Sequence, residues 1–534
     1  MTVAFLLPFV GKAFHVDDPF FVEAARQIRT NPLDFYGRDF NWWGTSQPMA
    51  EVAKNPPVTP FFIALVTAIA GEREISLHIA FLIPAVAATI GILVLARRFC
   101  RRPLAPALAA IATPVFVVSS TNVMCDTMQL AFWVWAVETW LRAHDSGRAG
   151  TFVASGLLVT LAALTKYVGI GLIPLLFAHG LARTRRLGPW TLALGIPLLA
   201  LAGYDVWTRE LYGRGLLSDA VGYSKGVRLQ TPVIFSAKPV AGLSFAGGCF
   251  VTVAFLAPWL WSRRAILAGA AAGAAFLLAV AAIGRLGHYS LEGPDGLRWG
   301  LIVQLTIFTL AGASLLALAV LDLVHGRDAD ALLLCLWIFG IFVFAVFLNW
   351  SLNARSLLSA TPAVGILIAR RLESRGVDRL PVVPLVLAAI LSLAVAWADA
   401  RLAASAREAA GRFTRELGAG PGRLWFEGHW GFQYYMEAGG ARPLDMSRSK
   451  LSAGDHVVVP MKNTNLFDLP RTHAAIQGRV DFPVVPFLAT VAQELGAGFY
   501  ADWWGPLPYA FGRVPVQPYV VVGITRDLQL EKNP

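Results

Sequence analysis

Charged residues are scarce in this chain of 534 residues, where Asp, Glu, Lys and Arg together make up 15%, against about 25% in a typical soluble domain. A soluble protein of this length divides into several domains, each with a polar surface. The composition, which is 56% hydrophobic, excludes an ordinary cytoplasmic enzyme, a disordered chain and a fibrous repeat. The class that remains is a polytopic helical membrane protein.

Cysteine is also rare, and common metal and nucleotide motifs are absent. The four cysteines suggest no disulfide framework: Cys100, Cys125, Cys249 and Cys335. The sequence has no zinc motif of the HExxH or CxxC type and no P-loop, because the Gly-rich run 418–422 lacks the Lys-Ser/Thr of a phosphate loop. The residues therefore predict no metal site.

Long apolar runs are what the sequence has in abundance. Thirteen of them are candidate membrane spans: 3–14, 76–97, 104–120, 127–143, 151–166, 168–184, 190–208, 243–261, 265–284, 300–324, 331–349, 353–370 and 381–398. The first lacks a basic start and a small-residue cleavage site, which predicts a retained helix rather than a signal peptide. The apolar stretch 58–70 is too short to span and is expected to lie in the interface or to re-enter.

Arginine clusters in short loops predict the orientation. They occur at 97–102, 183–186, 263–264 and 370–379, and the positive-inside rule assigns them to the cytoplasm. The excess of 45 Lys and Arg over 34 Asp and Glu therefore indicates cytoplasmic loops before any anionic partner, and no nucleic acid is expected. With thirteen spans and a cytoplasmic N-terminus, loops 15–75, 121–126, 166–168, 209–242, 285–299 and 350–352 are external.

The chain changes character after residue 399. A charged amphipathic helix over 399–417 is followed by strand-like runs at 423–426, 456–459 and 519–524, separated by Gly and Pro. We therefore expect two domains. Residues 1–399 form an all-α transmembrane domain, and residues 400–534 form a small soluble α/β domain on the external, periplasmic side.

Three acids open external segments and are candidates for chemistry. Asp17 and Asp18 lie in HVDDPFF, before an expected amphipathic helix over 19–28 and a loop rich in aromatic residues. Asp126 lies between two spans, where a buried acid is a functional candidate. The alternatives are solvated acids at a helix end for the pair and a helix N-cap for Asp126.

Three cations occur on the same side, against the positive-inside bias. They are Lys54, Lys166 and Arg355. Lys166 alternatively extends to the interface, beside Tyr167 in an aromatic belt. Acids next to cations at a membrane surface suit a reaction on a phosphate-bearing lipid, whereas a proton-coupled transporter would carry acids deep within its spans.

Five segments in order, HVDDPFF, KNPPVTPFFIAL, MCDTMQLAFW, LTKYVGIGLIP and NARSLLSATPAVGIL, resemble motifs of the GT-C fold glycosyltransferases of the protein O-mannosyltransferase and aminoarabinose-transferase type. The resemblance covers most of 10–400. Beyond it, EGHWGFQYYMEAGG at 427–440 is similar to a segment of bacterial members of the family. The resemblance implies a GT-C fold of about thirteen spans with an external C-terminal domain, in a bacterial inner membrane.

The same resemblance implies the chemistry. A sugar would pass from a polyprenyl-phosphate donor, with inversion, to a hydroxyl or phosphate of a protein, lipid A or surface glycan. Asp17 would act as the base, Asp18 and Asp126 would position the acceptor or the loop, and no metal would be required. The phosphate would be bound by Lys54, Lys166, Tyr167 and Arg355. The competing hypotheses are a lipid or solute transporter and a non-catalytic receptor.

Overall fold

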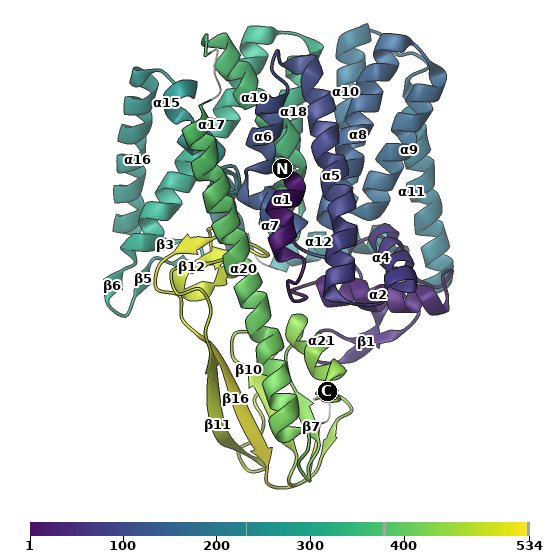
Figure 1. Ribbon diagram of the computed structural model, residues 1–534, viewed down its shortest axis with the longest axis vertical. Coiled ribbons are helices and arrows are strands. Elements are labelled where there is room, and N and C mark those ends of the chain that lie inside the picture. Colours follow the sequence, from purple (N-terminus) through teal and green to yellow (C-terminus); the bar gives the residue numbers. More distant parts are fainter. Residues whose placement is uncertain (231, 378–380, 531–534) are drawn as a thin grey trace.

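The computed structural model describes residues 1–230, 232–377 and 381–530. It consists of a large helical bundle with a smaller strand-containing part below it (Figure 1). The predicted fold class, a polytopic helical membrane protein with a C-terminal part that contains strands, is confirmed. Large apolar side chains such as Leu199, Leu267 and Val383 are at least 69% exposed on the outside of the bundle, as expected for surfaces that face lipid.

Each apolar run predicted from the sequence is mostly helical in the described residues. The main bundle helices are α5 (Glu74–Phe99), α8 (Cys125–Ser146), α9 (Ala149–Thr165), α10 (Leu172–Thr184), α11 (Thr191–Tyr212), α13 (Pro232–Cys249), α16 (Arg263–Ile283), α17 (Trp299–Gly326), α18 (Ala329–Val343), α19 (Thr361–Ser374) and α20 (Val382–Leu417). Seven described helical segments are long and apolar enough to cross a membrane. The count of thirteen spans stays a prediction.

Several expected spans are interrupted in the structure. The run 104–120 divides into α6 (Leu104–Ile111) and α7 (Pro114–Ser120), because Thr113 caps a helix that restarts at Pro114. The run 3–14 contains α1 (Thr2–Leu6) and the 3₁₀ helix η1 (Leu7–Phe9). Such interruptions are tolerated at membrane depth where neighbouring helices bury the backbone.

The arginine clusters occur at one end of the bundle. Helices α5, α10 and α19 end there and α16 begins there, at the top of Figure 1 and away from the strand-containing part. Ion pairs tie the helices together at this end, including Arg98–Glu138 at 2.7 Å and Arg370–Asp322 at 2.8 Å. Arg379 lies outside the described residues.

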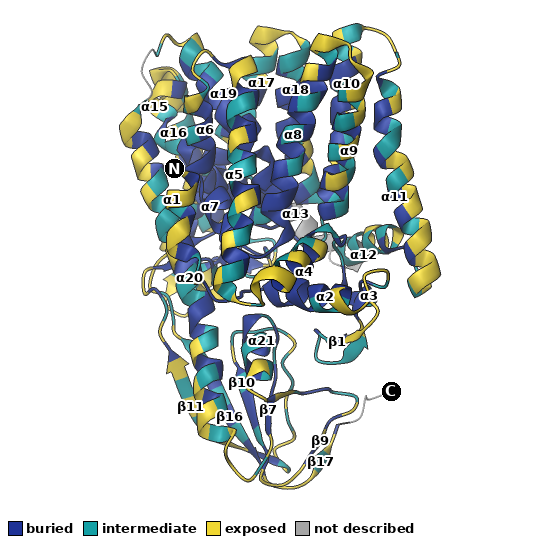
Figure 2. Cartoon of the chain, turned by 45° about the vertical axis from the view of Figure 1, so that its right-hand side comes forward, coloured by how far each residue is buried: buried dark blue, intermediate teal, exposed yellow. Residues whose placement is uncertain are grey.

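Short helices lie across the opposite end of the bundle (Figure 2). Helix α2 (Asp18–Thr30) is the expected amphipathic helix, and it buries Phe20, Phe21 and Ile28. Helix α4 (Val58–Ala70) packs against α2, and α12 (Leu216–Gln230) lies near it. This layer separates the bundle from the strand-containing part.

The C-terminal part is built on a five-stranded mixed sheet of order β11-β16-β10-β7-β8. The predicted strands are β7 (Leu424–Phe426), β10 (His456–Pro460) and β16 (Gln517–Ile524). Strand β11 (Ala474–Phe482) was not predicted; it pairs only with β16 and is largely exposed, so its sequence lacks a buried apolar face. Strand β8 (Arg442–Pro443) forms the other edge. Aromatic residues on one face, such as Phe426 and Tyr519, pack against Phe413 of α20 and Phe432 of α21 (Gly431–Ala438).

The two parts are more continuous than the expected division suggests. Helix α20 runs unbroken through residues 399 and 400, where the domain boundary was predicted. Residues 485–510 return from the sheet to the bundle and share its hydrophobic core, including Phe499 and Tyr509. Backbone hydrogen bonds hold this return segment, as from Ala354 N to Phe499 O at 2.9 Å.

A close backbone contact provides a test of how the two parts dock. A Cβ added at Gly431 would lie 2.1 Å from the carbonyl oxygen of Phe14, with no flexible side chain to move aside. We expect Gly431→Ala to destabilise the protein by about 1–3 kcal/mol, measured as a lower apparent melting temperature in detergent. Gly411→Ala is the control, because its Cβ meets only the guanidinium end of Arg415. Equal melting temperatures for both variants would contradict this docking.

Candidate functional site

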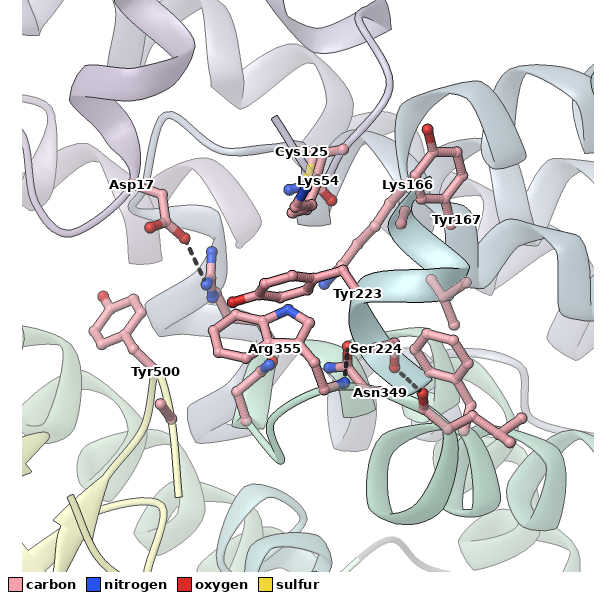
Figure 3. A pocket seen from close by; sticks show the side chains of 18 of the residues that line it. Asp17, Lys54, Cys125, Lys166, Tyr167, Tyr223, Ser224, Asn349, Arg355 and Tyr500 are labelled. Atoms are coloured by element: carbon pink, nitrogen blue, oxygen red, sulfur yellow. Dashed lines mark hydrogen bonds and ion pairs between the residues drawn. The ribbon is translucent and has the colours of Figure 1, made fainter. Parts of the chain in front are cut away.

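A cavity of about 850 Å³ lies where the bundle, the layer of short helices and the C-terminal part meet. Its described lining includes Asp17, Lys54, Lys166, Tyr167 and Arg355, five of the seven residues predicted as site residues. Asp18 and Asp126 do not line it. Figure 3 shows the side chains of Asp17, Lys166, Tyr223, Arg355 and Tyr500 around this space.

Asp17 faces the cavity at the start of α2. Its backbone carbonyl accepts hydrogen bonds from Phe20 N and Phe21 N, so the helix N-terminus fixes its position. Its carboxylate, 34% exposed, accepts a hydrogen bond from Arg355 Nη2 at 2.8 Å (Figure 3). An acid that is both ordered and accessible is suited to take up a proton from a ligand.

Asp18 points the other way and is fully buried. Its carboxylate accepts hydrogen bonds from the backbone N–H groups of His15 and Val123, each at 2.8 Å. Burial raises the pKa of Asp18 to about 7, and the charge of Lys12 opposes this rise. Asp18 therefore ties the first loop to the turn that precedes α8, a role that needs no contact with a ligand.

Asp126 lies in the first turn of α8 and is not its N-cap, which is Met124. The alternative prediction of an N-cap is therefore wrong, because the helix begins one residue before Asp126. Its buried carboxylate pairs with Lys166 Nζ at 2.6 Å and lies 3.5 Å from Arg355 Nη1. Asp126 thus holds two cations at the edge of the cavity.

The cations come from breaks in the helices. Lys166 lies in extended backbone between α9 and the 3₁₀ helix η2 (Tyr167–Gly171). Arg355 lies in the 3₁₀ helix η4 (Ala354–Ala360), whose N-cap Asn353 accepts a hydrogen bond from Ser356 N. The Arg355 guanidinium is 5.3 Å from the ring centroid of Tyr500. These breaks let charged side chains project from the ends of apolar helices.

Lys54 lines the cavity but has an acidic partner of its own. Its ammonium lies 2.6 Å from Asp219 of α12 and 4.9 Å from the ring centroid of Tyr223. Tyr167 lines the same space beside Lys166. The predicted phosphate-binding residues therefore share one cavity, with Lys54 paired to α12 and Lys166 paired to Asp126.

Two further groups were missed in the sequence. Arg228 of α12 lines the cavity and donates a hydrogen bond to Phe347 O at 2.6 Å. It is a cation in the loop 209–242, which was predicted to be external, so it carries the same signal as Arg355. Lys12 and Asp399 form a fully buried pair at 2.6 Å. The sequence pattern predicts Asp399 at the start of a polar helix, although an acid flanked by apolar residues is itself a signal.

Asp399 links this buried pair to the cavity. It accepts hydrogen bonds from Thr490 Oγ1 at 2.7 Å and from Tyr500 Oη at 2.8 Å. His15 Nε2 lies 3.7 Å from Asp399, and burial lowers the pKa of His15 to about 4. The Lys12–Asp399 pair and the neutral His15 therefore fix the position of Tyr500, which lines the cavity.

The segment EGHWGFQYY at 427–435 brings the C-terminal part to the cavity. Glu427 accepts a hydrogen bond from Phe467 N at 2.9 Å, and Tyr435 Oη accepts one from Phe14 N at 2.8 Å. His429 packs against Trp42 with ring centroids 4.9 Å apart. His429 and Trp430 both line the cavity.

The lining of the site carries more cations than acids. The described lining contains Lys54, Lys166, Arg228 and Arg355 but one carboxylate, that of Asp17. Asp219 and Asp126, which pair with Lys54 and Lys166, lie outside the lining. The wall contributed by α10, α18 and the π-helical turn η3 (Phe344–Leu348) is apolar. A cationic end beside an apolar wall suits an amphiphile with an anionic head.

The comparisons with known proteins agree with the motifs. Residues 54–207 match the sequence model of the family described as dolichyl-phosphate-mannose-protein mannosyltransferase. The matched segment contains Lys54, Asp126, Lys166 and Tyr167. The resemblance to GT-C fold membrane glycosyltransferases, predicted from the sequence, is thereby confirmed over this segment. No curated protein matches the chain.

Solved structures that resemble the chain include two with lipid phosphates. ArnT from Cupriavidus metallidurans bound to undecaprenyl phosphate is 15% identical, with a TM-score of 0.40, and the match covers 86% of this chain and 91% of that one. The archaeal oligosaccharyltransferase AglB from Archaeoglobus fulgidus, in complex with an inhibitory peptide and a dolichol-phosphate, is 12% identical, with a TM-score of 0.45 and coverage of 86% and 69%. Both superpositions are loose.

The buried carboxyl of Glu427 predicts a pH dependence of stability. Burial raises its pKa to about 7, so the folded protein keeps a proton that the unfolded chain loses as the pH rises. This group therefore lowers the stability progressively between about pH 4.5 and pH 7. We expect Glu427→Gln to reduce the fall in apparent melting temperature between about pH 5 and pH 8. The control is Glu416→Gln on the exposed end of α20. If the apparent melting temperature falls equally with pH in both variants and in the parent protein, the prediction is contradicted.

Proposed function

We propose that the protein is an inverting glycosyltransferase that moves a sugar from a polyprenyl-phosphate donor to an acceptor on the extracytoplasmic side of a bacterial inner membrane. The observation that carries the proposal is the cavity, in which the accessible carboxylate of Asp17 lies among cations beside an apolar wall. The match of residues 54–207 to a mannosyltransferase family, named for a lipid-phosphate donor, supports it.

The reaction needs a base, and Asp17 is suited to that role. An acceptor hydroxyl attacks the anomeric carbon of the sugar and forms the new C–O bond, while Asp17 takes up the hydroxyl proton. The bond between the anomeric carbon and the phosphate oxygen breaks, and its electron pair leaves with the lipid phosphate. The attack and departure occur on opposite faces of the sugar, which inverts the anomeric centre.

The leaving phosphate gains a negative charge as the bond breaks. Lys166 and Arg355 lie where they can stabilise that charge, with Arg228 and Lys54 on the α12 side of the cavity. Tyr167 borders the same space. The phosphate would compete with Asp17 for the guanidinium of Arg355, so donor binding would release the Asp17 carboxylate to act on the acceptor.

The remaining acids position these groups. Asp126 orients Lys166 and Arg355 through its ion pairs, and Asp18 fixes the backbone next to Asp17. No cluster of three or more His, Cys, Asp or Glu side chains suited to a metal occurs among the described residues. We assign the neutralisation of the phosphate to side-chain cations.

The orientation follows from the arginine clusters. The positive-inside rule assigns the end of the bundle that carries them to the cytoplasm. The N-terminus would then be cytoplasmic, and the cavity and the C-terminal part would face the periplasm. A polyprenyl-phosphate donor would enter from the bilayer along the apolar wall formed by α10 and α18.

Replacement of the proposed base tests the transfer. We expect Asp17→Asn to lower the rate by about 10²–10⁴-fold, because the amide cannot accept the hydroxyl proton. The measurement is mass spectrometry of proteins, lipid A and surface glycans from a deletion strain that expresses each variant. Asp39→Asn, at the exposed first position of strand β1 (Asp39–Asn41), is the control.

Two outcomes would contradict the proposal. Full modification by Asp17→Asn would remove Asp17 as the base. Movement of the lipid-linked sugar across liposomes by the purified protein, without any transfer, would favour the transporter.

The ion pair between Lys166 and Asp126 gives a second test. Lys166→Met should weaken binding of undecaprenyl phosphate about tenfold through loss of a charge-assisted contact. Asp126→Asn should leave it equal or tighter, because the amide oxygen can still accept the hydrogen bond that orients Lys166, whereas the negative charge that competes with the phosphate is removed. The double variant, with Lys166→Met and Asp126→Asn together, removes both partners and so leaves neither with an unpaired buried charge. It should bind undecaprenyl phosphate as weakly as Lys166→Met does. Isothermal titration in nanodiscs measures all three, and weaker binding by Asp126→Asn than by Lys166→Met would indicate a structural role for the pair instead.

A further inference from the structure

The cavity is divided by charge. Every charged side chain in its described lining belongs to the bundle or to the helices beneath it. The C-terminal part contributes only uncharged groups, among them Trp430, Thr464, Asn465, Trp503 and Trp504. Its one titratable imidazole, His429, is kept neutral because burial lowers its pKa to about 3. The wall formed by the bundle therefore suits a phosphate, and the wall formed by the C-terminal part suits a neutral polar ligand.

Backbone strain is concentrated at the same cavity. Among the described residues, five non-glycine residues have a positive φ. Arg185 and Arg327 are C-caps of α10 and α17, where left-handed backbone is common. The other three, Val16, Trp430 and Asn465, all line the cavity. Such conformations persist where the surroundings enforce them, and they cluster at ligand sites.

Trp430 is held in this conformation by its neighbours. Asn463 accepts a hydrogen bond from His429 N at 3.2 Å and donates one to His429 O at 3.0 Å. On the other side of Trp430, Gly431 packs directly on the backbone of Phe14. The residues that flank the indole are therefore fixed, and they present it to the cavity.

Two rows of aromatic rings border the cavity, and Trp430 belongs to the first. In one row, the ring centroids of Trp42 and His429 are 4.9 Å apart, those of His429 and Trp430 are 4.9 Å apart, and those of Trp430 and Trp504 are 6.0 Å apart. In the other row, Trp350 lies 5.9 Å from Tyr223 and 5.4 Å from Trp503. The consecutive residues Trp503 and Trp504 join the two rows.

Polar groups without charge accompany the rings. Thr464 Oγ1 lies 3.1 Å from His429 Nε2, whereas His429 Nδ1 is buried without a hydrogen-bond partner among the described residues. Asn465 adds an exposed amide at its left-handed position. Flat apolar faces combined with neutral donors and acceptors match the C–H faces and hydroxyls of a sugar ring.

We propose that this half of the cavity is a saccharide-binding subsite and that the acceptor is a hydroxyl of a neutral carbohydrate. The inference rests on the proposed function, since it assigns the substrate of the same site. The acceptor sugar would stack on the rings of Trp430 and Trp504 and present its hydroxyl to Asp17. An acceptor that carries a phosphate would place its charge against uncharged groups, which would be costly.

Binding of defined probes tests the subsite. The full-length protein, in nanodiscs that contain undecaprenyl phosphate, is applied to an array of neutral pentose and hexose oligosaccharides, Ser/Thr-rich peptides and lipid A. We expect capture by neutral oligosaccharides. Trp504→Ala and Asn465→Gly should each weaken it about tenfold. Glycine accepts a positive φ, so Asn465→Gly removes the amide without disturbing the backbone.

Two control variants separate this inference from the proposed function. Trp299→Ala removes a half-exposed indole at the start of α17, outside the cavity lining, and should bind like the parent protein. Asp17→Asn should also bind the oligosaccharides, although we expect its rate of sugar transfer to fall. Loss of transfer with retained binding thus supports both proposals, and retained transfer by Asp17→Asn refutes only the assignment of the base.

Other outcomes would overturn the subsite. They are preferential capture by peptides or lipid A, no capture by any neutral oligosaccharide, and unchanged binding by both Trp504→Ala and Asn465→Gly. The same binding measurement in nanodiscs without undecaprenyl phosphate tests whether the oligosaccharide and the lipid bind at separate sites. Equal binding with and without the lipid supports an acceptor site. Loss of binding in the presence of the lipid would mean that the oligosaccharide occupies the site of the lipid phosphate, which would overturn the acceptor subsite.

Discussion

The ion pairs around Arg355 are the interaction on which the functional end of the molecule depends. Arg355 lies between Asp17 and Asp126, and Lys166 pairs with Asp126 from the other side. Charges at the ends of apolar helices are costly unless they are paired. The paired side chains come from the first loop, the start of α8, the break before η2 and the start of η4. The pairing therefore draws four distant segments together, and the cavity lies among them.

A second buried pair couples the C-terminal part to this network. Lys12 lies between η1 and α2, shortly before Asp17, and Asp399 lies within α20, the helix that continues into the C-terminal part. Asp399 also binds Tyr500, whose ring lies against Arg355. The bundle and the sheet are thus connected through polar contacts as well as through a shared core. The C-terminal part is positioned to complete the cavity rather than to act as a separate appendage.

Some site residues were predictable because their signal is local. Lys166 and Arg355 are cations in segments predicted to be external, where the positive-inside rule predicts few, and the structure brings both to the cavity. The same signal applies to Arg228, which was overlooked within a long loop. The orientation of Asp17 and Asp18 was not predictable. The two are adjacent in sequence, yet one faces the cavity and the other accepts a hydrogen bond from Val123, 105 residues away.

The sequence by itself determined the membrane class, the helical segments, the end of the bundle that carries arginine and the candidate acids and cations. These follow from hydropathy and charge within short windows of the chain. Only the tertiary structure decided which acid is accessible, which cation each acid holds, and that Trp430 and Asn465 border the same space. Asp17 and Arg355 are 338 residues apart, and the chain between them must fold before their charges can pair. Coulombic and packing energies depend on distance in space, which no local pattern in the sequence specifies.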